Sequence, residues 1–280
     1  YVDDLSKISK KDIVEFANKY LGENYVVVFK RKGEDKNIVK VEKPIITPIE
    51  TNTNKQSAFV KMVNNMPASV VSPVWINYNK DLQKSAIGPA RVLYVQNKDN
   101  SIFRLRYRFE MGTWNDKKLG IAAQYLSFLG TANKTAEDIT KEFYKIACSF
   151  NVNAGAEYTT VTIEGLQENF KQAVVLFEDL LENCQVNEEA LKSLKARLTK
   201  ARTDAKSNKG AILNGLTAYA RFGSNNPFND VLKDEEIKNL DAAELVKTLH
   251  NLNQYPHDVI YYGPLQLTAL TAELKKFHKI

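Results

Sequence analysis

Apolar and polar residues alternate along residues 102–111, which is the clearest strand pattern in the chain. The apolar positions are Phe103, Leu105, Tyr107, Phe109 and Met111, and the polar positions between them are Arg104, Arg106, Arg108 and Glu110. Because successive side chains of a strand point to opposite faces, this pattern predicts one buried and one solvated face. The arginine face could bind an acidic partner, but a solvated sheet face is favoured, since a sheet with helices on one side produces such a face anyway.

Shorter patterns predict the remaining elements of the domain. Strands are expected at residues 90–96, 151–156 and 158–165, and helices at residues 116–129, 168–184, 187–208 and 211–222. Another helix is expected to begin at Thr135, which forms a capping pattern with Asp138, and Gly130 suits the end of the preceding helix. This mixture predicts the α+β class, with an antiparallel-rich sheet and helices packed on one face.

A capped helix followed by an apolar strand occurs near both ends of the chain. The first copy begins at Ser9 and Asp12 and leads to an apolar strand at residues 25–29. The second copy begins at residues 241–244 and leads to an apolar strand at residues 258–262. We expect this last strand to form an edge of the sheet. Two copies of one ending imply a repeated domain.

The repeat predicts three parts of the chain. Residues 1–31 are expected to be the C-terminal tail of a preceding homologous domain. Residues 32–73 are rich in Asn, Lys, Thr and Pro, a composition that indicates an extended linker. Residues 74–280 are expected to form the compact domain.

Composition narrows the classes of function. The chain has 280 residues, 44% of them hydrophobic, and a formal net charge of +6 from basic and acidic residues that are mixed along its length. Nucleic-acid binding is disfavoured because neither a concentrated basic face nor a known docking motif is present. No apolar run is long enough to span a membrane. A reduced, packed pair is favoured for Cys148 and Cys184, although a disulfide stays open, as does the choice of periplasm or cytoplasm.

Residues 121–131 keep the apolar frame of a metal-binding helix but contain no strong metal ligand. Zinc is held by imidazole nitrogen, thiolate sulfur or carboxylate oxygen, whereas the positions expected to face inward carry Ile121, Gln124 and Tyr125. The three histidines of the chain, His250, His257 and His278, lack the spacing of a helical zinc pair, and scattered surface histidines are the favoured interpretation. Neither a nucleophile elbow nor a phosphate loop is present.

Three successive segments resemble the insulinase and pitrilysin family of zinc metallopeptidases, peptidase family M16. They are residues 125–131, 134–139 and 150–158. Active members carry His-x-x-Glu-His-Met-x-Phe-x-Gly-Thr on the first segment's helix, and residues 128–131 fit the end of that motif. The resemblance then puts Ile121 and Tyr125 at the two histidine positions and Gln124 at the glutamate.

The family's third zinc ligand, a glutamate, comes from a later helix that matches residues 194–204. That segment carries Lys195, Arg197, Lys200 and Arg202, with Asp204 at its end. Cations oppose metal binding directly, so the resemblance implies an inactive third, non-zinc domain with the M16 peptidase (LuxS/MPP-like) fold. It also implies no cofactor in this chain and zinc in an N-terminal domain of the parent protein, where a glutamate would activate the metal-bound water.

The resemblance predicts a non-catalytic domain that completes a substrate chamber and helps to bind peptide while another domain hydrolyses it. The expected partners are other domains of the same parent or a homologous catalytic subunit, together with a peptide substrate. Tyr219 and Arg221 are the candidates for peptide contact. The basic helix at residues 192–209 could attract acidic peptides, although a solvated helix face is favoured. The alternative function is a scaffold or partner subunit of a heteromeric assembly without catalysis.

Overall fold

The computed structural model divides the chain into two units, Tyr1–Val71 and Ser72–Ile280. It describes residues 2–5, 7–30, 33, 42–49, 51, 53, 55–67 and 71–279. Part of the predicted linker, residues 32–73, lies outside the described residues, and the boundaries of the three predicted parts stay a prediction.

The first unit contains three short helices, α1 (Val2–Leu5), α2 (Lys10–Tyr20) and α3 (Ala58–Asn64). The capping box of α2 forms as the sequence predicts, because Ser9 and Asp12 bond each other's backbone amides. The predicted strand at residues 25–29 is wrong, since these residues have no strand assignment. A strand exists only through hydrogen bonds to a neighbouring strand, and none is present among the described residues of this unit.

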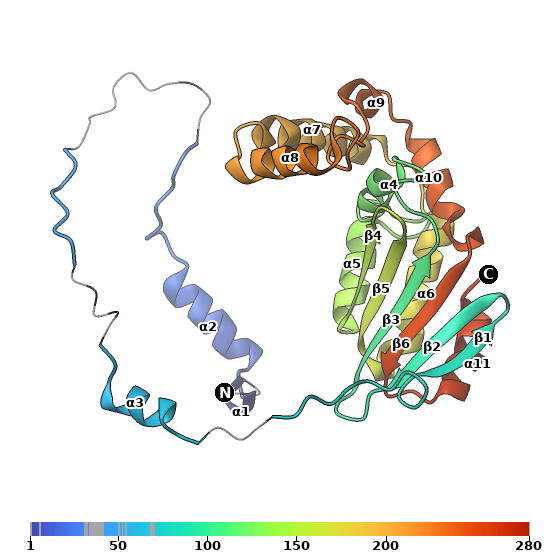
Figure 1. Ribbon diagram of the computed structural model, residues 1–280, viewed down its shortest axis with the longest axis horizontal. Helices are drawn as coiled ribbons and strands as arrows, with labels where there is room; N and C mark the ends of the chain where they lie inside the picture. The colour runs from blue at the N-terminus through green and yellow to red at the C-terminus, as the bar shows by residue number, and fades with distance from the viewer. Residues whose placement is uncertain are drawn as a thin grey trace. The chain divides into compact units, whose positions relative to one another are not determined.

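The second unit contains one six-stranded sheet, shown in Figure 1. Its strands are β1 (Gln83–Ile87), β2 (Ala90–Gln96), β3 (Ile102–Phe109), β4 (Cys148–Ala154), β5 (Thr159–Leu166) and β6 (His257–Gly263). Their order is β1-β2-β6-β3-β5-β4, with β2 and β6 parallel and all other neighbours antiparallel. The alternation predicted for β3 is confirmed, because Phe103, Leu105, Tyr107 and Phe109 are fully buried.

The final strand occupies the centre of the sheet. The prediction that residues 258–262 form an edge is wrong, because β6 pairs with β2 on one side and with β3 on the other. Val259 and Tyr261 are at most 1% exposed. The apolar run indicated a strand, but only long-range pairing decides its position in the sheet.

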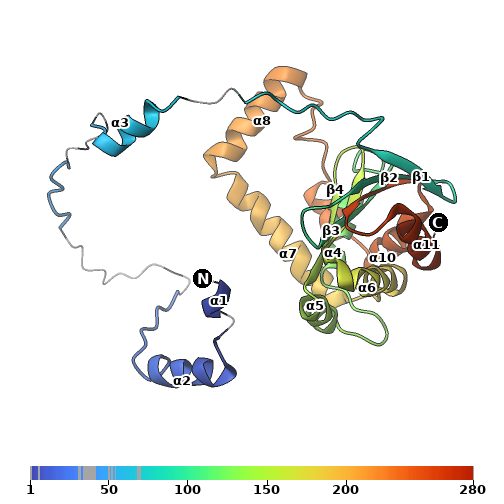
Figure 2. The same cartoon turned by 90° about the horizontal axis from the view of Figure 1, so that it is seen from below.

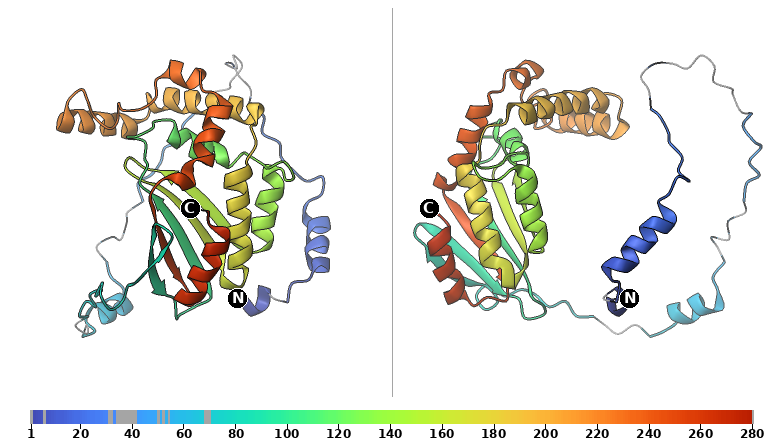
Figure 3. Two further views of the ribbon diagram at one scale, coloured as in Figure 1. Left: turned by 90° about the vertical axis from the view of Figure 1, so that its right-hand side faces the viewer. Right: turned by 180° about the vertical axis from the view of Figure 1, so that it is seen from behind.

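The helices of the second unit are α4 (Leu119–Leu126), α5 (Ala136–Lys145), α6 (Phe170–Asn183), α7 (Glu188–Ala205), α8 (Lys209–Phe222), α9 (Asp234–Lys238), α10 (Ala242–His250) and α11 (Leu267–Phe277), with 3-10 turns at Gln167–Asn169 and Leu252–Gln254. Figure 2 shows α5, α6 and α11 lying on one face of the sheet, as the α+β prediction requires. Figure 3 shows α7 and α8 projecting from one end of this layer.

The helix that contains residues 121–126 is shorter than predicted, since α4 ends at Leu126 rather than Leu129. Gly130 therefore does not close it. A Cβ at Gly130 would lie 2.3 Å from the carbonyl oxygen of Lys134, so this glycine permits the close backbone approach that leads into α5. The capping box that begins α5 at Thr135 is confirmed.

Two histidines lie inside the domain rather than on its surface. His257 Nε2 is 2.8 Å from His278 Nε2, and His278 Nδ1 is 2.8 Å from Glu178 on α6. His257 Nδ1 donates to the carbonyl oxygen of Tyr255 at 2.8 Å, so its Nε2 carries no hydrogen and accepts a hydrogen bond from the Nε2–H of His278. This network of buried side chains fastens the end of α11 to α6.

The histidine network predicts a pH dependence of stability. Burial, followed by the effect of His278, lowers the pKa of His257 below 6.5, against the opposing hydrogen bond to Tyr255. The unfolded chain binds a proton near pH 6.5 while the folded domain resists it. The unfolding free energy should therefore be highest above pH 6.5 and decrease as the pH falls through this value.

Urea unfolding at pH values from about 7.5 down to about 5 measures this decrease. The His257→Gln variant should show a flatter profile over the same range. Asp258 affects the unfolding free energy only at lower pH, because its hydrogen bond to Arg91 lowers the pKa of its carboxyl below 3.8. Parallel profiles for wild type and variant above pH 5 would contradict the prediction.

Candidate functional site

The three positions singled out on α4 have different environments. Ile121 is buried against the core. Gln124 is exposed, and its Nε2 donates to the carbonyl oxygen of Gly120 on the same helix at 3.2 Å. The prediction that all three side chains face inward is therefore wrong for Gln124. The helical spacing that keeps Ile121 and Tyr125 on one buried face turns the intervening Gln124 toward solvent.

Tyr125 connects α4 to the start of α7. Its side chain is fully buried, and its hydroxyl donates to the carbonyl oxygen of Asn187 at 2.8 Å and accepts from the Asn187 amide at 2.9 Å. Burial raises the pKa of the Tyr125 phenol, against the lowering effect of the Asn187 backbone hydrogen bond. The phenol thus stays neutral and serves as a hydrogen-bonding link between two helices.

Four basic residues of α7 make contacts within the domain. Lys195 donates to the carbonyl oxygens of residues 238 and 240, and Arg197 lies over the Phe128 ring at 5.2 Å. Arg202 pairs with Asp234 at 2.6 Å. Within the same helix, Lys200 pairs with Asp204 at 2.5 Å. These contacts give each of the four cations a structural role.

These side chains do not fit a zinc ion. Ile121 has no atom that can coordinate a metal, and the Gln124 side chain lies on the surface. The Tyr125 hydroxyl donates one hydrogen bond to the Asn187 backbone and accepts another from it. On α7, the positions that match the family's third ligand carry basic side chains, and these make contacts elsewhere in the domain. Across the described ranges, no group of three or more His, Cys, Asp or Glu side chains is arranged to hold a metal.

The sequence over these strands and helices matches a known family. The family described as Insulinase (Peptidase family M16) matches residues 91–235, which is over half of the 280 residues. The chain belongs to the insulinase family. The resemblance seen in the sequence is thereby confirmed.

Two curated relatives and one solved structure define the similarity. Mitochondrial cytochrome b-c1 complex subunit 1 from Homo sapiens is 25% identical over 156 residues, which cover 55% of this chain and 32% of that protein. A protein named uncharacterized zinc protease from Rickettsia bellii is 27% identical over 140 residues, which cover 49% and 31%. The chain thus spans about a third of the length of these relatives.

The fold of this chain is similar to that of a solved structure. The crystal structure described as a peptidase M16 inactive domain from Pseudomonas fluorescens superposes with a TM-score of 0.61 at 20% sequence identity. The match covers 71% of this chain and 50% of that chain. The sheet with helices on one face is therefore the fold of the insulinase family. In the part of the chain that the structure describes, no helix is long and apolar enough to cross a membrane.

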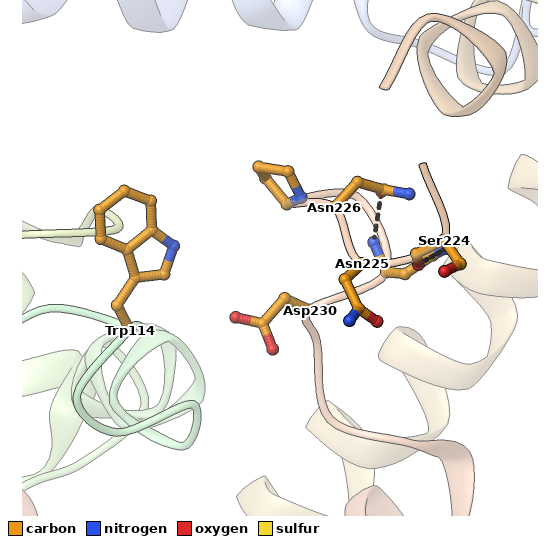
Figure 4. Close-up of a pocket in the computed structure, with 7 residues that line it drawn as sticks. Trp114, Ser224, Asn225, Asn226 and Asp230 are labelled. Carbon is orange, nitrogen blue, oxygen red and sulfur yellow. Dashed lines mark hydrogen bonds between the residues drawn. The ribbon is translucent and has the colours of Figure 1, made fainter. Parts of the chain in front are cut away.

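A polar pocket of about 370 Å³ lies next to α4 in this insulinase-family domain. Figure 4 shows Trp114, which precedes α4, facing the loop at residues 224–230 that follows α8. Asn226 is 6% exposed and holds this loop, since it donates to the carbonyl oxygen of Gly223 and accepts from two backbone amides of the loop. Asp230, which lines the pocket, pairs with Lys117 at 2.5 Å. The other polar side chains that line the pocket, Ser224, Asn225, Asn226 and Asn229, are uncharged and offer hydrogen bonds.

The two candidates for peptide contact lie on different sides of α8. Tyr219 follows Ile212 at a spacing of seven residues and shares its face, and it is 60% exposed. Arg221, nine residues after Ile212, falls on the opposite side at 3.6 residues per turn. Their role in peptide binding stays a prediction.

The arginine face of β3 is largely paired. Arg104 pairs with Glu164 at 2.7 Å, and Arg108 and Arg91 both reach Asp258, at 2.9 and 2.8 Å. These pairs join neighbouring strands on the sheet face opposite the helices. The favoured interpretation of a solvated sheet face agrees with this pairing.

Proposed function

We propose that the second unit is a non-catalytic domain of an insulinase-like zinc metallopeptidase, which completes the substrate chamber and holds the peptide while another domain hydrolyses it. The environment of Tyr125 carries the proposal. The family resemblance assigns this position to a metal-binding histidine. Here the Tyr125 side chain is fully buried, and its hydroxyl makes two hydrogen bonds to the Asn187 backbone. Zinc is then expected in another domain of the parent protein.

The proposal includes the arrangement of the chain in three parts. Residues 1–31 would be the tail of a preceding homologous domain, residues 32–73 a linker and residues 74–280 the non-catalytic domain. Support comes from the sequence pattern near both ends, a capped helix followed by an apolar run, although the first run forms no strand in the structure. Val26 and Val28 are 91% and 88% exposed, whereas the corresponding β6 residues Val259 and Tyr261 are buried at the centre of a sheet.

Removing residues 1–71 tests this arrangement. Because the second unit has its own sheet and core, the shortened chain should unfold with a Tm within about 2 °C of the full chain. It should also bind less of a hydrophobic dye, since the exposed valines are gone. A large loss of stability would show that the first unit belongs to the core of the second.

Incubation with zinc and a library of fluorescent peptides tests the function. We expect peptide binding, measured by fluorescence anisotropy, without cleavage. Cleavage that a chelator abolishes and that survives repurification of the chain would overturn the proposal. Binding to none of the peptides would remove the peptide-holding role.

A scaffold or partner subunit without catalysis is the second candidate. The similarity to cytochrome b-c1 complex subunit 1, named as a subunit of a complex, favours it. The zinc-binding motif of the parent or partner sequence distinguishes a peptide-holding domain from a scaffold. An intact His-x-x-Glu-His motif in the parent or partner supports the peptidase, whereas a second degenerate motif there supports the scaffold.

A further inference from the structure

Helix α8 presents an apolar face that the domain leaves uncovered. Ile212, Leu216 and Tyr219 recur at spacings of four and three residues, so they lie on one side of the helix. They are 47%, 62% and 60% exposed, and none of the described residues 209–222 is buried. A helix with such a face normally packs against another surface, and here it borders a groove.

The groove has a volume of about 690 Å³. It is formed by the end of α7, the first half of α8 and the segment at residues 228–234, and Figure 2 shows α7 and α8 diverging from the turn that joins them. Its apolar walls include Ile212, Leu216, Phe228 and Val231, all of them partly exposed. This volume lies within the range of 300–1,000 Å³ that is usual for ligand sites in proteins.

Gly215 explains how Phe228 can form a wall of the groove. A Cβ at this position would lie 3.0 Å from the Phe228 ring, closer than ordinary contact. Glycine in the middle of a helix is unfavourable by about 1 kcal/mol relative to alanine. Because Gly215 has no side chain, the Phe228 ring can lie against the α8 backbone.

The charges around the groove are mainly positive. Arg202 pairs with Asp234 and donates to the carbonyl oxygen of Leu232, so this arginine holds the wall in place. Lys206 and Lys233 also line the groove, and neither pairs with a carboxylate among the residues described. An occupant with negative charges would therefore be attracted to the rim.

We propose that this groove binds an extended peptide segment in which apolar residues are flanked by acidic residues. The apolar side chains would contact Ile212 and Leu216, and the acidic residues would lie near Lys206 and Lys233. The proposal rests on the peptide-holding role of the domain and names the class of peptide that it holds. Tyr219 extends the same face by one further turn.

Three labelled peptides and the full chain test the proposal by fluorescence anisotropy. The first peptide has the sequence Asp-Glu-Asp-Leu-Phe-Leu-Glu-Asp-Glu, the second replaces its acidic residues with lysine, and the third replaces its apolar residues with serine. The first should bind most tightly, and added salt should weaken its binding. Equal binding of all three would overturn the assignment of the peptide class.

Leu216→Asp and Leu213→Asp form a matched pair of variants. Both leucines lie on α8 and are 62% and 63% exposed, but only Leu216 is among the residues that line the groove. Leu216→Asp should weaken binding of the first peptide by about 10-fold and Leu213→Asp by less than about 2-fold, because a buried leucine contact is lost in only one case. Circular dichroism should be unchanged in both.

A second pair of variants tests the charge of the rim. Lys206→Glu, at the C-cap of α7, should weaken binding of the acidic peptide, whereas Lys192→Glu, in the first half of α7 and outside the groove lining, should not. If peptides bind but both pairs of variants bind alike, the groove assignment fails and the peptide-holding role stands. If none of the three peptides and no library peptide binds, the peptide-holding role itself fails.

Discussion

Replacement of Tyr125 by alanine is expected to lower the unfolding free energy of the domain by about 3–5 kcal/mol, as for other large buried aromatic residues. The change removes a fully buried ring at the contact between α4 and α7. It also leaves the amide and the carbonyl of Asn187 without their partner. Urea unfolding of wild type and variant measures the loss.

Two further variants separate the ring from its hydroxyl. Tyr125→Phe keeps the packing but loses both hydrogen bonds, so it should cost about 1–3 kcal/mol. Gln124→Ala, at the neighbouring exposed position, should change stability by no more than about 0.5 kcal/mol. Equal and small effects at Tyr125 and Gln124 would contradict the view that α4 now serves packing rather than chemistry.

Local structure follows closely from the sequence. The strand at residues 90–96 is observed as β2 with the same bounds, and the alternation along β3 places its apolar residues in the core. The capping residues Thr135 and Asp241 begin α5 and α10. These features depend on neighbours within a few residues, which the sequence displays directly.

Long-range pairing could not be predicted in the same way. The apolar residues 258–262 indicated a strand, but its insertion between β2 and β3 depends on partners more than 140 residues away. The pairing of His257 with His278 through the core has the same origin, since their spacing of 21 residues has no local meaning. Both errors concern tertiary contacts rather than secondary structure.

The candidate site was predicted in part. The absence of strong zinc ligands at Ile121, Gln124 and Tyr125 is visible in the sequence, and Tyr219 lies on the apolar face that borders the groove. The groove itself was missed, because it needs the end of α7, the start of α8 and residues 228–234 together. The spacing of Ile212, Leu216 and Tyr219 was the available signal, and it could not show that this face stays uncovered.

Replacement of Glu178 by alanine is expected to be as damaging as the loss of Tyr125. The Glu178 side chain is 9% exposed and accepts from His278 Nδ1 at 2.8 Å and from Asn253 Nδ2 at 3.2 Å. Without it, His278 is left beside the Tyr107 ring, which stacks on it at 4.0 Å, with no acceptor for its Nδ1 proton. Removing one partner of a buried pair costs about 3–5 kcal/mol.

Glu182 provides the control, because it lies one turn further along α6 and pairs with Lys279 at the surface. Glu182→Ala should therefore cost less than about 1 kcal/mol. Hydrogen exchange adds a local measurement, since Glu178→Ala should release α11 and reduce the protection of its amides, while Glu182→Ala should not. Equal unfolding free energies for the two variants would mean that α11 is held by its apolar contacts, through Leu270 and Leu274, and not by the histidine network.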